Sequence, residues 1–153
     1  MKQMVGLVVA AHGRLAEELV ATAEQIVGPI PGVKTVGIEP GSTPEVIRQK
    51  MREAVHDLDA GEGVLVLADL FGGTPCKESL MLLHREHLEV LAGVNLPMLL
   101  KAASLRKEHL PLAELALTLA AYTQKNITCA SEQLRAAAAR AAAAASGNVP
   151  GRS

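Results

Sequence analysis

Two stretches of the chain are apolar at almost every position, and they constrain the fold more than any other feature. They cover residues 4–11 and 64–68. A strand with one face in water alternates apolar and polar side chains, so a short uninterrupted apolar run predicts a strand that is covered on both faces. Strands of this kind belong to parallel sheets that lie between two layers of helices.

Segments with helical patterns separate the predicted strands. Helices are predicted over 14–27, 44–60, 76–85, 97–104 and 112–122, and two more strands over 33–38 and 88–94. This alternation predicts an α/β fold with a doubly wound, mainly parallel four-stranded sheet and helices on both faces. In the expected strand order, 2-1-3-4, the loops after the first and third strands border one crevice, and ligands of such sheets bind there.

Local patterns add further expectations. In the first helix, the residues expected to face the core recur at helical spacing: Leu15, Leu19, Ala23 and Ile26. The charged segment 105–109 is expected to be exposed. Ile127 and Thr128 favour an extended chain, so 126–129 is expected to form a short last strand.

Composition suggests one domain over 1–130, followed by an alanine-rich tail over 131–153 that is partly helical or disordered. Alanine has the highest helix propensity, but about 15 residues alone are only marginally helical in water. A net charge of −1 and 1% aromatic residues argue against a nucleic-acid partner, which needs clustered cations and stacking rings. The N-terminal apolar run is too short to span a membrane and lacks a signal-peptide cleavage site, so we expect a soluble, cytoplasmic protein.

The first strand runs directly into His12, and the third strand runs into Asp69. The expected strand order places these two strand ends side by side. A neighbouring carboxylate would accept a proton from one ring nitrogen of the histidine and leave the lone pair of the other nitrogen pointing outward. This arrangement predicts a nucleophilic histidine; the alternative is an incidental polar residue at one strand end and a turn residue at the other.

Gly72, Gly73 and Thr74 follow Asp69 and precede a predicted helix that opens with Pro75. Two glycines allow backbone N–H groups to form a concavity, and a helix N-terminus favours negative charge, so the loop predicts a site for a phosphoryl group. The Thr74 hydroxyl could donate to a phosphate oxygen, cap the helix, or do both. The sequence has neither GxxxxGK[ST] nor GxGxxG, so nucleotide binding through those motifs is not predicted.

Other polar groups have simpler interpretations. The run at 84–87, His-Arg-Glu-His, matches neither HExxH nor HxxEH, so we expect a solvated helix end and no metal site. Cys76 and Cys129 lack metal-ligand spacing, and we expect two reduced thiols, with one disulfide as the alternative. Lys77 is either solvated or a positive charge near a phosphoryl group or an acidic edge of a partner.

Three separated segments resemble one protein family, the IIA domain of the mannose/fructose/sorbose class of the bacterial phosphoenolpyruvate-dependent sugar phosphotransferase system. The segments are GLVVAAHG at 6–13, VLADLFGGTP at 66–75 and LAGVNLPML at 91–99. Their order and spacing agree with the family over residues 4–130. One departure is Cys76, where the family usually has Asn; it bears on which partner docks rather than on His12.

The resemblance implies a phosphotransferase that works as a phosphocarrier. His12 would accept a phosphoryl group on Nε2 from the phosphocarrier protein HPr and pass it to a histidine-bearing IIB component in sugar uptake. Asp69 would orient His12 through Nδ1. The phosphoryl group would be lined by Gly72, Gly73 and Thr74, and neither a cofactor nor a metal is implied.

The resemblance also has consequences for assembly. The family's domain is a homodimer whose last strand is antiparallel at the sheet edge and is exchanged between subunits, which agrees with the expectation for 126–129. Members often carry a linker to a IIB domain after this point, so the alanine-rich tail suggests a free-standing IIA protein with a vestigial linker. The membrane would be involved only through transporter components, and the sugar is not specified.

Three other functions stay open. One is the phosphotransfer subunit of a dihydroxyacetone kinase, whose first domain the chain also resembles. Another is a regulatory protein in which a partner reads the phosphorylation state of His12 without a transporter. The third is a small-molecule-binding, flavodoxin-like domain, for which the sequence has no flavin or nucleotide motif.

Overall fold

The computed structural model describes residues 3–70, 72–84 and 86–147. The chain divides into two compact units, Met1–Thr123 and Gln124–Ser153. The strands are β1 (Gly6–His12), β2 (Val33–Ile38), β3 (Val64–Ala68) and β4 (Leu88–Ala92). The helices are α1 (Leu15–Val27), α2 (Pro44–Leu58), α3 (Thr74–Leu80), α4 (Leu96–Leu105), α5 (Leu112–Lys125) and α6 (Ala130–Ala145), with a 3-10 turn, η1 (Arg106–Glu108). Among the described residues, no helix combines the length and the apolar character needed to cross a membrane.

The four strands form one parallel sheet in the order β2-β1-β3-β4, as predicted. β1 lies between β2 and β3, and its residues from Leu7 to Ala11 have no exposed surface. This complete burial explains why the strand is apolar at successive positions rather than at alternate ones.

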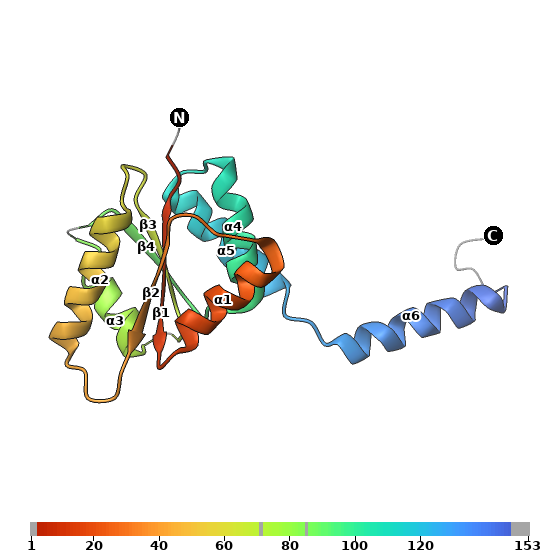
Figure 1. Cartoon of the computed structure of the whole chain (residues 1–153). Helices are drawn as coiled ribbons and strands as arrows, with labels where there is room; N and C mark the ends of the chain where they lie inside the picture. The colour runs from red at the N-terminus through yellow and green to blue at the C-terminus, as the bar shows by residue number, and fades with distance from the viewer. Residues whose placement is uncertain (1–2, 71, 85, 148–153) are drawn as a thin grey trace. The chain divides into compact units, whose positions relative to one another are not determined.

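Helices cover both faces of the sheet: α2 and α3 lie on one face, and α1, α4 and α5 lie on the other (Figure 1). Successive side chains of a strand point to opposite faces. Leu7 and Val9 therefore pack in the core beneath α1, α4 and α5, whereas Val8 and Ala10 pack beneath α2 and α3. His12 has the same parity as Val8 and Ala10, so the strand directs its side chain to the α2–α3 face.

The buried face of α1 differs from the prediction. Its buried residues are Ala16, Val20 and Ala23, with Leu19 partly buried. Leu15 and Ile26, which were predicted to face the core, are 45% and 58% exposed. Both sets recur at helical spacing, so periodicity alone does not distinguish them. Small side chains at positions 16 and 23 allow the helix to lie close to the sheet.

The prediction that 105–109 is exposed is wrong for two residues: Leu105 is 5% exposed and Arg106 is 3% exposed. Arg106 Nε donates to the carbonyl oxygen of Val5 at 2.7 Å, and its Nη2 donates to those of Pro31 at 2.8 Å and Gly32 at 3.3 Å. These carbonyls stand just before β1 and β2, where a buried charged donor satisfies them. Burial lowers the pKa of Arg106 from its ordinary value.

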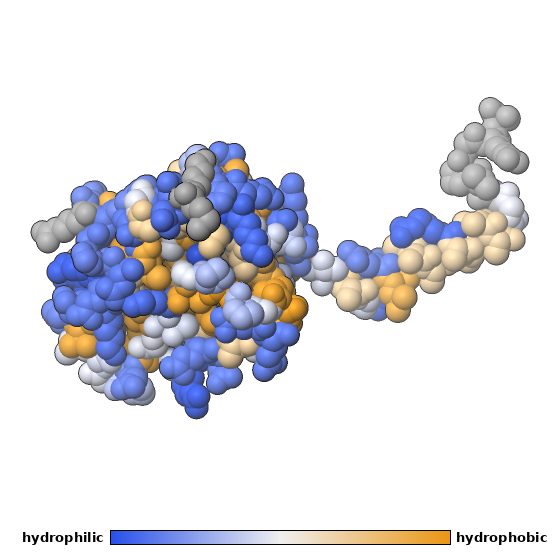
Figure 2. Space-filling model, turned by 45° about the horizontal axis from the view of Figure 1, so that its top comes forward, coloured by the Kyte–Doolittle hydropathy of each residue, from blue (hydrophilic) through white to orange (hydrophobic). Residues whose placement is uncertain are grey.

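In the second unit, residues 126–129 belong to neither a helix nor a strand, so the predicted last strand is not part of the sheet of a single chain. Ile127 in this segment is 79% exposed. α6 follows and has no buried residues. Figure 2 shows its alanine-rich surface interrupted by polar side chains. Residues 148–153 of the predicted tail lie outside the described residues.

Candidate active site

His12 is the last residue of β1, and the backbone around it is closely held. Gly13 has φ +59°, a left-handed conformation that favours glycine, and its N–H donates to the carbonyl oxygen of Ile38 at 2.9 Å. A Cβ on Gly37 would lie 2.8 Å from the carbonyl oxygen of Gly13, so β2 approaches this turn closely because residue 37 has no side chain. The His12 side chain itself is 51% exposed.

Asp69 holds His12 through two contacts. Its Oδ2 accepts the backbone N–H of His12 at 3.0 Å and lies 2.7 Å from His12 Nδ1. Its Oδ1 accepts the N–H of Leu70 at 2.9 Å, and its own N–H donates to the carbonyl oxygen of Ala10 at 3.2 Å, which continues the pairing of β3 with β1. The two residues are 57 positions apart in sequence, and the structure brings them together as predicted. Since Nδ1 faces the carboxylate, Nε2 is the ring nitrogen left free to react.

The electrostatics of this contact favour an ionised carboxylate. The Asp69 side chain is 8% exposed. Burial raises the pKa of Asp69, but the hydrogen bonds from the His12 backbone and ring and from the Leu70 backbone together outweigh burial, so the pKa lies below its ordinary value. Next to an ionised carboxylate, the favoured tautomer of a neutral imidazole has its hydrogen on Nδ1 and its lone pair on Nε2.

The start of α3 lies against the edge of the His12 ring. Gly72 has φ +81°, and Gly73 forms the N-cap of α3. A Cβ on Gly73 would lie 3.0 Å from Leu70 Cγ and 3.3 Å from His12 Cε1, so a side chain there would crowd Leu70 first and the ring second. The start of α3 therefore borders the ring at Cε1, the carbon that joins the two ring nitrogens. Phe71 in this loop lies outside the described residues.

The structure corrects two expectations about α3. Gly73 is the N-cap, and the cap has no side-chain hydrogen bond, so Thr74 is the first residue of the helix rather than its cap. The helix ends at Leu80 instead of continuing to position 85, which lies outside the described residues. The N–H groups of Thr74 and Cys76 belong to the first turn and have no acceptor within the helix, while Pro75 has no N–H.

The remaining candidates from the sequence do not join this site as ligands. His84 and His87 are not buried, and within the described residues no group of three His, Cys, Asp or Glu side chains is arranged to hold a metal ion. Cys76 is buried and Cys129 is exposed, and both are free thiols. Lys77 is exposed on α3.

Two features near the site were missed from the sequence. A hollow of about 390 Å³ opens beside His12 at the ends of β1 and β2; its lining comprises Gly13, Arg14, Glu17, Gly37, Glu39, Pro40 and Lys50. The other feature is an ion pair between Arg48 of α2 and Glu78 of α3. The sequence gives one indication that Glu78 is related to the site: it is four residues after Thr74, so both lie on the same face of the helix.

The fold is that of IIA components of bacterial sugar phosphotransferase systems. The mannose/sorbose-specific IIA subunit from Enterococcus faecalis superposes with a TM-score of 0.74 at 34% identity, over 82% of this chain and 94% of that chain. By sequence, the fructose-specific EIIA component of Bacillus subtilis is 32% identical over 86% of this chain and 90% of its own length. The mannose-specific EIIAB component of Escherichia coli K12 is 36% identical over 68% of this chain, which spans 32% of that longer protein.

The chain belongs to the family described as PTS system fructose IIA component, which matches residues 6–120. The match includes all four strands and both residues of the His12–Asp69 pair. The resemblance inferred from three short segments of sequence is thereby confirmed, and with it the membership in a family of sugar phosphotransferase components.

Proposed function

We propose that this chain is a phosphocarrier that accepts a phosphoryl group on His12 from phospho-HPr and passes it to a IIB component in sugar uptake. The observation that carries the proposal is the 2.7 Å contact between His12 Nδ1 and Asp69 Oδ2, made by a ring that is half exposed. The contact leaves Nε2 free, and the exposure lets another protein present a phosphoryl group to it. A cytoplasmic location belongs to the same proposal.

In the proposed transfer, the phosphoryl group passes directly from one histidine to another. The lone pair of His12 Nε2 forms an N–P bond while the N–P bond of the donor's phosphohistidine breaks, and the donor imidazole leaves with the electron pair. The positive charge that develops on the His12 ring is stabilised by Asp69 through the proton on Nδ1. Transfer to the acceptor repeats the step in the opposite direction. Phosphoryl transfer depends mainly on position and electrostatics, which a fixed ring provides.

The proposal assigns the phosphoryl oxygens to the loop made of Gly72, Gly73 and Thr74. It is supported by the proximity of Gly73 to the Cε1 edge of the His12 ring. Thr74 is the first residue of α3 rather than its N-cap, and the proposal assigns its hydroxyl to donate to a phosphoryl oxygen. Backbone N–H groups in the first turn of α3 are oriented toward the same region.

The partners in this proposal are proteins, and the openness of the site supports that assignment. The mixed charges that line the hollow beside His12 offer contacts to a partner's surface. One relative is mannose-specific and another is fructose-specific, so the proposal does not name the sugar that is taken up. The proposal includes a homodimer that exchanges residues 126–129, consistent with the exposure of Ile127, and sedimentation of the purified chain measures it.

Phosphorylation from a defined donor tests the proposed function. The chain is incubated with phosphoenolpyruvate, enzyme I and HPr, and the intact mass is measured. We expect one phosphoryl group per chain, labile in acid and stable in base, on the wild type and none on His12→Ala. Labelling of His12→Ala to the same extent as the wild type would refute the assignment of the site.

A further inference from the structure

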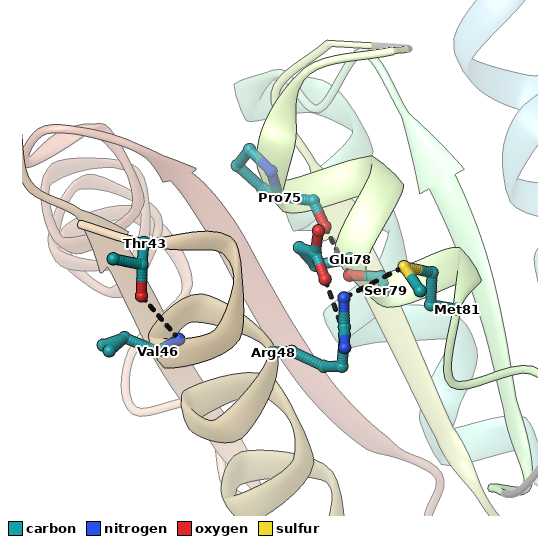
Figure 3. Close-up of polar contacts among 7 residues, drawn as sticks. All are labelled: Thr43, Val46, Arg48, Pro75, Glu78, Ser79 and Met81. Carbon is teal, nitrogen blue, oxygen red and sulfur yellow. Dashed lines mark hydrogen bonds and ion pairs between the residues drawn. The ribbon is translucent and has the colours of Figure 1, made fainter. Parts of the chain in front are cut away.

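α3 is joined to α2 by a nearly buried ion pair. Arg48 Nε donates to Glu78 Oε2 at 2.8 Å, and Arg48 Nη2 lies 3.3 Å from the sulfur of Met81 (Figure 3). The Glu78 side chain is 5% exposed, and that of Arg48 is 30% exposed. Among the described residues, no other ion pair connects α3 to another element.

The beginning of α3 is held by the burial of Pro75 and Cys76 and not by a capping side chain. Two glycines precede it, the cap at Gly73 has no side-chain hydrogen bond, and the N–H of Gly73 reaches the carbonyl oxygen of Leu70 at a long 3.3 Å. The helix is also short, ending at Leu80. Apolar burial specifies the rotation of a helix less sharply than an ion pair does, so the contact of Glu78, one turn further along, is the one suited to set that rotation.

Helix geometry connects that contact to the candidate site. Residues four apart lie on the same face of a helix, so Thr74 and Glu78 are aligned one turn from each other. A rotation of α3 about its axis would carry both side chains together. Because Arg48 comes from α2, which packs on the same face of the sheet, its bond to Glu78 fixes this rotation.

We propose that Arg48 and Glu78 are a positioning pair: their bond sets the rotation of α3 and thereby places Gly73 and Thr74 against the phosphoryl group on His12. The inference rests on the proposed function. A buried ion pair is weak evidence for stability, since apolar residues of similar volume often replace such pairs without loss. What an ion pair adds is a defined direction, because the guanidinium nitrogen and the carboxylate oxygen must meet in one geometry.

The test compares Glu78→Ala and Glu78→Gln with the wild type in two measurements. In the first, the transfer rate from phospho-HPr is followed as its concentration is varied. We expect Glu78→Ala to lower the maximal rate on the order of tenfold and to leave the half-saturating concentration within about twofold, because the complex forms but the reacting atoms are misplaced. Glu78→Gln retains the length of the side chain and an acceptor oxygen, so its rate is expected to fall between the two.

The second measurement does not require phosphorylation. In the NMR spectrum of the unphosphorylated protein, we expect Glu78→Ala to shift the His12 Cε1–H resonance and to weaken its contact with the Gly73 Cα protons. If the wild type takes up no phosphoryl group, the proposed function fails, and this spectrum still decides whether Glu78 positions α3 against the ring. An unchanged His12 resonance together with an unchanged rate in Glu78→Ala would overturn the inference.

Two control variants separate positioning from general destabilisation. Asp57→Asn breaks a 2.7 Å ion pair with Lys34 that joins α2 to the start of β2, away from His12, and should leave the maximal rate unchanged. Arg106→Met removes a buried arginine at the opposite end of the strands from His12. At a temperature where Arg106→Met and Glu78→Ala are both folded, Arg106→Met should transfer the phosphoryl group at the wild-type rate. If its rate falls as much as that of Glu78→Ala, the positioning role of Glu78 is contradicted.

Discussion

At the scale of single residues, Asp69 determines what His12 can do. A neutral histidine has one nitrogen with a hydrogen and one with a lone pair, and its neighbours select between the two tautomers. The same carboxylate oxygen meets both the backbone N–H and the Nδ1 of His12. One side chain therefore orients the ring and favours the tautomer with its hydrogen on Nδ1.

Asp69→Asn tests this role with almost no change in shape. The amide that this substitution introduces can donate to Nδ1, which would place the hydrogen on Nε2 and remove the lone pair that accepts phosphorus. We expect the transfer rate to fall on the order of 100-fold while the fold is retained. Stopped-flow transfer from phospho-HPr measures the rate, and circular dichroism monitors the fold. A rate equal to that of the wild type would remove the orienting role.

The lowered pKa of Asp69 also predicts a pH dependence of stability. A carboxyl group with a lower pKa in the folded state than in the unfolded state stabilises the fold above its unfolded pKa, about 3.9, and loses this contribution as the pH falls through the folded pKa. The difference in unfolding free energy between the wild type and Asp69→Asn should be constant above about pH 5 and should shrink below about pH 4. Urea titrations across this range measure it. A difference that grows on acidification would contradict the direction of the pKa shift.

His12 and Asp69 could be found from the sequence because each directly follows an apolar strand, and the topology brings those strand ends together. Arg48 and Glu78 could not be found in this way. Their contact depends on the register of two helices packed on the same face of the sheet, and neither helix signals its neighbour in its own pattern. Arg106 was wrongly predicted to be exposed for a related reason: its partners are backbone carbonyls distant in sequence, and nothing in the charged segment around it indicates them.

At the scale of elements, α3 and the two glycines before it form the proposed phosphoryl site. Gly72 and Gly73 have different requirements. Gly72 is held in a left-handed conformation with open space around it, whereas Gly73 has no such strain but touches the His12 ring and Leu70. Substitutions at Gly72 therefore test the effect of backbone strain, and substitutions at Gly73 test the effect of crowding near His12.

Alanine substitutions at these positions are expected to have different effects. Gly73→Ala should lower the transfer rate by about tenfold, since its Cβ would displace His12 or Leu70. Gly72→Ala should lower the free energy of unfolding by about 1–2 kcal/mol through its positive φ and largely keep the transfer rate. Urea unfolding and the transfer assay on both variants measure the pair. The reverse pattern would show that the contact between Gly73 and His12 does not matter.

The elements themselves were largely predictable, and their faces were less so. Strand order followed from the alternation of strands and helices, because right-handed crossovers leave few topologies. In α1, Ala23 is buried as predicted, but of the residues around it Ala16 and Val20 are buried in preference to Leu15 and Ile26. Periodicity predicts that a helix has an apolar face, but the distance between the helix and the sheet determines which residues are buried against the sheet.

At the scale of the whole molecule, the candidate site and the buried arginine lie at opposite ends of the strands. The His12–Asp69 pair lies where β1 and β3 end, whereas Arg106 joins η1 to the carbonyls that precede β1 and β2. This separation allows the site to be open and half exposed while the other end is closed by a buried cation. In the second unit, α6 has no buried residues.

Arg106→Met is expected to weaken the fold without changing the chemistry. The carbonyls of Val5, Pro31 and Gly32 would lose a charged donor, at a cost of about 2–3 kcal/mol in the free energy of unfolding. The midpoint of urea unfolding measures the loss. A wild-type midpoint would show that water or neighbouring groups satisfy these carbonyls equally well.

The central claim is that Asp69 leaves Nε2 of His12 as the nitrogen that carries the phosphoryl group. The most direct measurement is an NMR spectrum of the phosphorylated protein with ¹⁵N-labelled histidine, in which coupling to phosphorus identifies the modified nitrogen. We predict a single phosphohistidine at His12 with phosphorus bonded to Nε2 and Nδ1 still carrying its hydrogen. Phosphorus on Nδ1, or on another residue while His12 is unmodified, would contradict the role of the 2.7 Å contact between Nδ1 and Asp69.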